Sequence, residues 1–224
     1  MTRTRLAILS LILVLVMAAA GTWVALSLPA DLRLPTHWNQ YGRVDRTGSK
    51  WEALFVVPGV TGLISLILYF IPALEPRGKN LERSAGLYLT AWLGLLIVMA
   101  ATEIALLGAA LRWPVPVPTL IEASIGVLFL LIGNQLGKSR SMFLAGIRTP
   151  WTLSSEEVWI ATHRLAGKLM AGTGLVLIVA AFLPLPDSVQ GVLLVALPLA
   201  STLLPAAYSY VLWRREQSGG QRKA

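Results

Sequence analysis

The sequence predicts an all-α fold: a polytopic membrane helix bundle with six transmembrane helices and both termini on the cytoplasmic side. Of its 224 residues, 55% are hydrophobic and 13% are charged, and the mean hydropathy is +0.67. These values exclude an ordinary soluble domain and are typical of an integral membrane protein. Six apolar blocks suit helices that cross a hydrocarbon core of about 30 Å: residues 6–28, 53–74, 85–111, 120–136, 165–183 and 189–213.

The basic residues predict the orientation of the bundle. With both termini inside, fourteen of the 19 Lys and Arg residues are cytoplasmic, as the positive-inside rule requires: Arg3, Arg5, Arg77, Lys79, Arg83, Lys138, Arg140, Arg148, Arg164, Lys168, Arg214, Arg215, Arg222 and Lys223. The remaining five are Arg33, Arg43, Arg46, Lys50 and Arg112. The net charge of +8 therefore indicates contact with anionic lipid and not direct binding of nucleic acid.

The tryptophans agree with these spans. Trp23, Trp51, Trp113 and Trp213 fall at predicted span ends, as an aromatic belt requires, whereas Trp92 sits deeper.

The first apolar block is compatible with an uncleaved anchor or with a signal peptide. Small residues at 18–20 resemble a signal-peptidase site, but the apolar character continues through Trp23, Val24 and Leu28, which favours an anchor. The orientation of the later helices is the same in either case.

Residues 29–51 form the predicted extracytoplasmic loop. Its side chains at His37, Trp38, Asn39 and Tyr41 make an aromatic and polar cluster suited to binding a peptide or a lipid headgroup. An ordered loop whose aromatic rings lie on the membrane surface explains the same residues equally well.

Residues 137–163 form the predicted cytoplasmic loop. Ser154 and Glu157 match a capping box, which predicts that an amphipathic helix starts at Ser155, and Pro150 argues against an earlier start. Apolar positions then recur at helical spacing into the fifth block. A solvated connector between two membrane helices is the alternative explanation.

Of the polar residues within the predicted spans, three are candidates for a functional role: Glu103, Glu122 and Asn134. A carboxylate in hydrocarbon is unfavourable by several kcal/mol unless it is protonated, paired or hydrated. Glu122 follows a tight turn and is expected at the interface. Glu103 is about two and a half turns deep, which suits either a functional carboxylate or a structural hydrogen bond to Thr102, Ser124 or a carbonyl freed by proline.

No catalytic motif is present, so we do not expect an enzyme, a cofactor or a metal site. The sequence contains no cysteine, which excludes disulfides and thiolate chemistry. Its two histidines, His37 and His163, are expected on opposite sides of the membrane and cannot share a site. His163, near Arg164 and Glu157, suits an interfacial structural role better than a proton carrier.

An ordered string in the cytoplasmic loop resembles the signature of the SdpI family of bacterial membrane proteins, named for an immunity protein against a secreted toxin peptide. The resemblance covers residues 146–153, the Ser154–Trp159 segment and residues 162–165, with 132–134 and the Lys138/Arg140 pair upstream. The family commonly has an asparagine where this chain has Ser141 and Met142. As binding residues this resemblance implies Arg148, Thr149, Pro150, Trp151, Glu157, His163 and Arg164.

The N-terminal region resembles a small extracytoplasmic domain of unknown function that often precedes the SdpI region. Residues 35–39, Gly42, Asp45, Gly48 and Lys50 carry this similarity. It implies that ligand contacts outside the membrane involve His37, Trp38, Asn39 and Asp45. The expected organisation is residues 1–75 for the first two spans and their loop, and 76–224 for an SdpI-like region of four spans.

Two function classes follow. The resemblance implies an immunity and signalling protein of the bacterial cytoplasmic membrane that meets a secreted peptide toxin outside and a repressor or other regulator inside. The alternative is a small ion-coupled transporter in which Glu103 is the working carboxylate and the helix with Pro198 and Pro205 moves. Against the transporter, the six spans show no obvious internal repeat.

Overall fold

The computed structural model describes residues 2–220. The long helices are α1 (Arg3–Ser27), α2 (Lys50–Phe70), α4 (Ala85–Leu111), α5 (Val117–Leu136), α7 (Glu156–Ala181) and α8 (Asp187–Gly220). The shorter elements are β1 (Arg33–Trp38), β2 (Val44–Ser49), the 3-10 turn η1 (Ile71–Leu74), α3 (Gly78–Arg83) and α6 (Pro150–Ser154). Within the described residues, 6 helices are long and apolar enough to cross a membrane, which confirms the predicted helix bundle.

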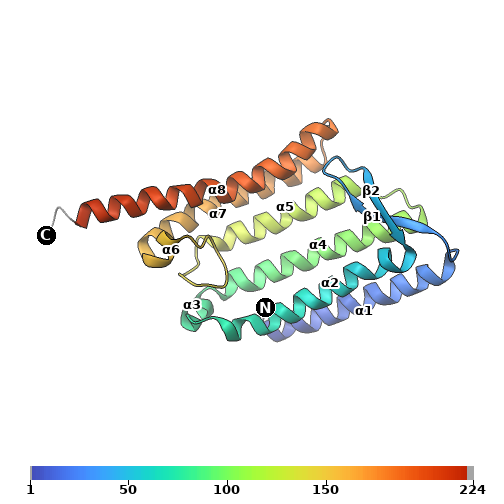
Figure 1. Cartoon of the computed structure of the whole chain (residues 1–224), viewed down its shortest axis with the longest axis horizontal. Coiled ribbons are helices and arrows are strands. Elements are labelled where there is room, and N and C mark those ends of the chain that lie inside the picture. Colours follow the sequence, from blue (N-terminus) through green and yellow to red (C-terminus); the bar gives the residue numbers. More distant parts are fainter. Residues whose placement is uncertain (1, 221–224) are drawn as a thin grey trace.

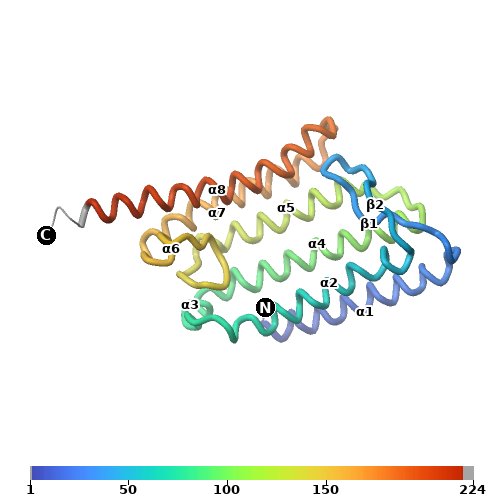
Figure 2. The backbone as a smooth tube through the Cα atoms, viewed as in Figure 1, coloured from blue at the N-terminus to red at the C-terminus, as the bar shows by residue number. Residues whose placement is uncertain are grey.

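The long helices lie side by side, and the polar segments gather at the two ends of the bundle (Figure 1). Helix α1 packs on α2, both pack on α4, and α5, α7 and α8 follow as successive neighbours. A β-hairpin covers one end, here called the hairpin end, whereas α3, α6 and residues 137–149 form the other, the loop end (Figures 1 and 2). The membrane face that each end meets stays a prediction. Arg222 and Lys223, counted above as cytoplasmic, lie outside the described residues.

Glycines bring α5 and α7 into backbone contact. A Cβ atom added to Gly126 would lie 2.8 Å from the Gly174 carbonyl oxygen, and one added to Gly167 would lie 2.8 Å from that of Gly133. Any side chain at these positions would therefore collide with backbone, which cannot swing aside. This close approach unites the two central helices of the region between α4 and α8.

Trp92 lies in the core, as its depth in the sequence predicts. It is fully buried, and its Nε1 donates to the Ser10 hydroxyl at 3.1 Å, which in turn donates to the Leu6 carbonyl. An indole N–H in an apolar core needs such an acceptor. The bond thus joins α1 to α4 through a polar pair that hydropathy alone does not reveal.

The start of the amphipathic helix differs from the prediction. Thr149 caps a separate short helix, α6, through a reciprocal capping box with Thr152, and Pro150 occupies its first turn, where proline is favoured. Helix α7 then begins at Glu156, and its N-cap is Ser155, whose hydroxyl accepts from the Val158 N–H at 3.2 Å. The predicted box of Ser154 and Glu157 is therefore wrong, because α6 places the extended break in the chain at Ser155.

The hairpin at residues 33–49 was not predicted from the sequence, which suggested only an ordered loop. Its strands have mostly exposed side chains and show little apolar alternation. Two strands of this kind are marginal in isolation and need a supporting surface. That surface is the end of the helix bundle, which a pattern within the strands does not encode.

Candidate functional site

Asn39 builds the turn of the hairpin. Its side-chain oxygen accepts from the N–H groups of Tyr41 at 2.9 Å and Arg43 at 3.1 Å, and its own N–H donates to the Arg43 carbonyl. Gly42 has a φ of 70°, a conformation that glycine adopts without strain. Asn39 thus shapes the turn, and the aromatic and polar cluster expected from the sequence is displayed on a defined scaffold.

One polar contact between the strands and one ion pair to α2 set the electrostatics of the hairpin. His37 Nδ1 lies 2.6 Å from an oxygen of Asp45, and Arg46 donates to Glu52 of α2 at 2.8 Å. The His37 and Asp45 side chains are 63% and 44% exposed, so solvent screens this pair. The structure therefore brings together two of the predicted ligand contacts, His37 and Asp45, on one accessible edge.

Lys50 attaches the hairpin to the bundle. Its side chain is buried, and Nζ donates to the carbonyls of Ala25 at 2.6 Å and Leu28 at 2.7 Å. These carbonyls lie at the C-terminal end of α1, where a cation complements the helix dipole. Leu34 of β1 packs into the apolar cluster beneath. The hairpin, which forms a roof over this end of the bundle, is consequently attached through both strands: β1 by Leu34 and β2 by Lys50, the residue that follows it.

Under this roof lies a cavity of about 600 Å³, here called the outer cavity. It is bounded by the hairpin and by α2, α4, α5 and α8. Its lining residues are Thr36, His37, Trp38, Asn39, Gln40, Tyr41, Gly42, Asp45, Arg46, Glu52, Ala53, Val56, Val57, Thr102, Leu106, Val117, Pro118, Ile121, Glu122, Asp187, Gln190 and Leu194. A concave, mainly apolar space with a few polar groups has the character of a ligand site.

Glu122 belongs to the wall of this cavity, and its predicted position at the membrane interface stays a prediction. It is 3% exposed, and its Oε1 has no hydrogen-bond partner among the described residues. The hairpin covers the end of α5, so a position that is near the end of its helix is still shielded. Asn134, toward the other end of α5, is exposed on the bundle surface.

Glu103 is 2% exposed, and neither carboxylate oxygen has a hydrogen-bond partner among the described residues. The structural bonds suggested from the sequence are absent there. Thr102 donates to the Val98 carbonyl at 2.9 Å, and Ser124 donates to that of Ile121 at 2.8 Å. Each hydroxyl donates to a carbonyl of its own helix and not to Glu103. Among the described residues Glu103 is therefore a buried carboxylate without a hydrogen-bond partner.

The loop end has a different organisation, in which Glu75 holds the segment 137–149. Its carboxylate accepts from the N–H groups of Phe143 at 3.0 Å and Leu144 at 2.7 Å. Asn80 donates to the Ser141 carbonyl at 2.7 Å. Backbone donors on a carboxylate are charge-assisted and strong. The segment is therefore fixed by residues that precede it by more than sixty positions.

Arg77 reinforces the same contact. Its guanidinium lies 4.9 Å from the centre of the Phe143 ring, and it donates to the Ser141 hydroxyl and to the Leu153 carbonyl. The sequence assigned Arg77 only an orienting charge and did not single out Glu75. No local spacing pointed to either role, because the loop residues that they bind lie 64 to 76 residues away along the chain.

His163 fixes the other side of this segment, and its predicted position at the membrane interface stays a prediction. The ring is fully buried and stacks on Trp159, with centroids 3.9 Å apart and planes 17° apart. Nε2 accepts from the Ile147 N–H at 2.9 Å, so Nδ1 carries the proton and donates to the Trp159 carbonyl at 2.8 Å. Nearby Gly146 has a φ of 114°, where a side chain would be strained and would meet the Trp159 ring.

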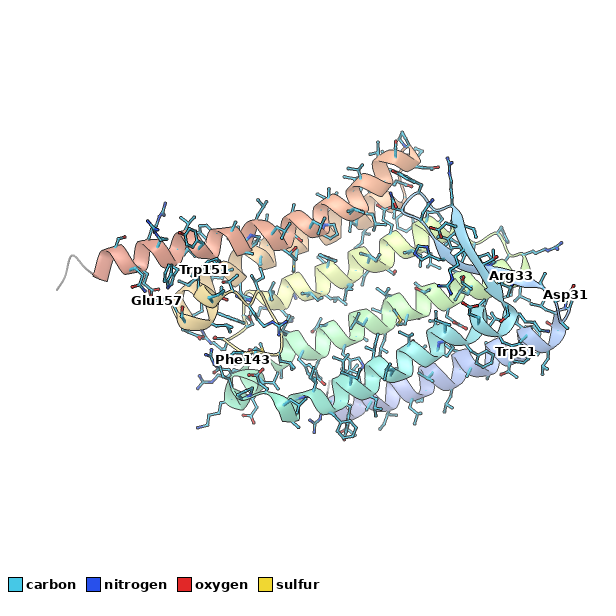
Figure 3. All side chains as sticks on the ribbon, in the orientation of Figure 1. Asp31, Arg33, Trp51, Phe143, Trp151 and Glu157 are labelled. Carbon is cyan, nitrogen blue, oxygen red and sulfur yellow. The ribbon has the colours of Figure 1, made fainter. Side chains whose placement is uncertain are left out.

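The predicted binding residues at 148–151 mostly stabilise the loop end. Arg148 donates to the Phe143 carbonyl at 2.5 Å, and Thr149 shares a hydrogen bond of 3.1 Å with Ser209 of α8. Trp151 lies 5.0 Å from the Tyr210 ring, centre to centre. Glu157 and Arg164 are exposed and lack these contacts. Figure 3 shows Trp151, Phe143 and Glu157 at the loop end, far from Arg33 and Trp51 at the hairpin end.

Two regions of the chain match known protein families. Residues 138–209 match the SdpI/YfhL protein family, and residues 12–62 match a domain of unknown function, DUF1648. The immunity protein SdpI of Bacillus subtilis (strain 168) is 26% identical over 134 residues, which cover 60% of this chain and 62% of that protein. No solved structure matches. The chain is therefore similar to the SdpI/YfhL family at residues 138–209 and to DUF1648 at residues 12–62.

Proposed function

We propose that this chain is a membrane-bound immunity protein, and that the outer cavity receives a segment of a secreted peptide toxin. The observation that carries the proposal is the cavity of about 600 Å³ beneath an anchored hairpin. Its lining includes four residues that the N-terminal resemblance implied: His37, Trp38, Asn39 and Asp45. The similarity to a protein named for immunity supports the same function.

The hairpin end suits an encounter with a peptide. Trp38 and Tyr41 supply aromatic surface, and the strand edges offer polar backbone groups. Lys50 and Leu34 hold this scaffold on the bundle before any ligand arrives. A preformed surface of this kind binds with a smaller loss of conformational entropy than a mobile loop.

The direct test fills the cavity without disturbing the hairpin bonds. Val56 and Val60 lie one turn apart on α2 and are both exposed on the bundle, but of the two only Val56 lines the cavity. We expect Val56→Trp to lower the peptide dose that cells survive by about tenfold or more, equivalent to about 1.4 kcal/mol of binding. Val60→Trp should protect like the native protein at matched membrane abundance. Equal protection by both variants would contradict the proposal.

We further propose that the loop end signals by binding a cytoplasmic regulator. At the loop end, Phe143 is 44% exposed although Glu75 and Arg77 hold its backbone and ring, and Arg140 and Arg148 are exposed nearby. An anchored aromatic residue among basic side chains suits a cytoplasmic repressor or other regulator. Phe143→Ala should abolish toxin-dependent reporter expression while protection persists. An unchanged reporter would remove Phe143 from any such interface.

A second candidate function, ion-coupled transport, is favoured by Glu103, whose two carboxylate oxygens are buried without partners among the described residues. Immunity predicts that protection survives Glu103→Gln and is lost in a Trp38, Asn39 and Asp45 triple alanine variant. Transport predicts the reverse, because a carboxylate that loads and releases an ion cannot be replaced by an amide. Loss in both variants would assign Glu103 to support of the fold beneath the hairpin.

A further inference from the structure

Glu122 is the most deeply buried charged group bordering the outer cavity. The residue is 3% exposed, and its Oε1 has no hydrogen-bond partner within residues 2–220. A buried carboxylate oxygen without a donor is unfavourable, so native structures seldom leave one without a functional reason. Glu122 is also one of the residues that line the outer cavity, so a ligand in this cavity would lie beside it.

The other ionisable groups of the cavity are arranged differently. Asp45 lies against His37, and Glu52 is paired with Arg46. Asp187 lies in the first turn of α8, where the helix dipole favours a negative charge, and it is exposed to solvent. Glu122 is therefore the carboxylate of this site that is both shielded and without a cationic neighbour among the described residues.

Aliphatic side chains make up part of the cavity wall. Val57, Leu106 and Ile121 line the same cavity, from α2, α4 and α5 respectively. A hydrated inorganic cation has no apolar surface to bury against such walls. A cation on an aliphatic stem is stabilised there, because the stem packs along the walls. Lysine and arginine side chains have this combination of an apolar stem and a charged head.

We propose that Glu122 receives a protonated amine or guanidinium carried on an aliphatic stem, as in a lysine or arginine side chain of the ligand. This inference rests on the proposed function, because it names the chemistry that the same cavity recognises. The cationic group donates to the carboxylate, and the stem contacts the apolar walls. Glu103, which does not line the cavity, takes no part in this recognition.

The test uses the purified full chain in phosphatidylcholine nanodiscs and isothermal titration calorimetry. The probe is a short, end-blocked peptide with one lysine between leucines, compared with the same peptide carrying acetyl-lysine and with an arginine version. We expect the native protein to bind the lysine and arginine peptides about tenfold or more tightly than the acetyl-lysine peptide. Equal affinity of the native protein for the charged and neutral peptides would overturn the inference.

The variants assign the preference to Glu122. Glu122→Gln should remove most of it, Glu122→Asp should retain part, and Glu103→Gln, which changes an equally buried carboxylate, should retain all. If Glu103→Gln abolished the preference as fully as Glu122→Gln, the assignment would be wrong. Should Glu122→Gln fail to fold, the native preference and the Glu122→Asp variant still decide the question.

A second arm distinguishes a peptide from a lipid as the source of the cation. Adding phosphatidylethanolamine to the nanodiscs supplies an ammonium headgroup. If this lipid weakens binding of the lysine peptide several-fold in the native protein but not in Glu122→Gln, the lipid ammonium competes for the same carboxylate. That result supports the site and identifies its occupant in the membrane.

The outcome is separable from that of the proposed function. A charge preference that depends on Glu122, found together with full protection by Val56→Trp, would support the cation site and reject the immunity role of the cavity. Loss of protection in Val56→Trp without any charge preference would reject the cation site alone.

Discussion

Glu75 Oε2 accepts a hydrogen bond of 2.7 Å from the N–H of Leu144, 69 residues further along the chain. This contact makes the loop end a folded unit: the turn after α2 supplies the acceptor, and the connection between α5 and α6 supplies the donors. The conformation of the loop therefore depends on Glu75, which lies outside the region that matches the SdpI family, residues 138–209.

Removing the Glu75 charge should loosen the loop end. Glu75→Gln leaves a weaker acceptor for the Phe143 and Leu144 N–H groups, and we expect a loss of about 1–3 kcal/mol in the free energy of unfolding. Amide exchange at 143–144 should accelerate. The control is Glu82→Gln on α3, which alters an exposed carboxylate and should change stability by less than about 0.5 kcal/mol. Matching exchange rates in the two variants would count against the contact.

His163 should be required as an acceptor and not as an acid or base. His163→Phe preserves an aromatic ring against Trp159 but leaves the Ile147 N–H without its acceptor, which should destabilise the protein by about 1–3 kcal/mol. Thermal unfolding in detergent measures the effect. Arg164→Gln, at an exposed neighbouring position, serves as the control. A His163→Phe protein as stable as the control would show that stacking, and not the hydrogen bond, is what matters.

The two glycines of α7 that lie closest to each other in sequence should respond in opposite ways. A Cβ at Gly174 would collide with the backbone of α5, whereas a Cβ at Gly172 would meet nothing within 4 Å. Gly174→Ala should destabilise the bundle by about 1–3 kcal/mol. Gly172→Ala should be neutral or stabilising by up to about 1 kcal/mol, because alanine favours the helix. Thermal unfolding of both variants provides the comparison, and a stable Gly174→Ala protein would refute the close approach.

The hairpin end and the loop end should face opposite sides of the membrane. The chain has no cysteine, so Arg43→Cys and Phe143→Cys each introduce a single labelling site. A membrane-impermeant maleimide should modify Arg43→Cys in intact cells and Phe143→Cys only after permeabilisation. Reporter fusions after Arg46 and after Lys79 should likewise give opposite results. Labelling of both sites in intact cells would reject the predicted orientation.

The sequence by itself determined the class of the protein, the number of its long helices and their approximate limits. Hydrophobic burial in lipid depends on the composition of each consecutive block, so a local count is sufficient. The depth of Trp92 and the presence of two polar regions were likewise predicted. The string around residues 146–159 was also specific enough to indicate the family region, since its order of residues needs no knowledge of the fold.

Tertiary structure decided everything that depends on partners from distant positions. The hairpin needs the bundle end as its support, and the outer cavity draws its walls from two strands and four helices. The same dependence placed Glu122 on the wall of that cavity, gave His163 a buried hydrogen bond and joined Glu75 to Leu144. Spacing within one segment reports neighbours on that segment alone, whereas these side chains are satisfied, or left without a partner, by elements that only the packed bundle brings together.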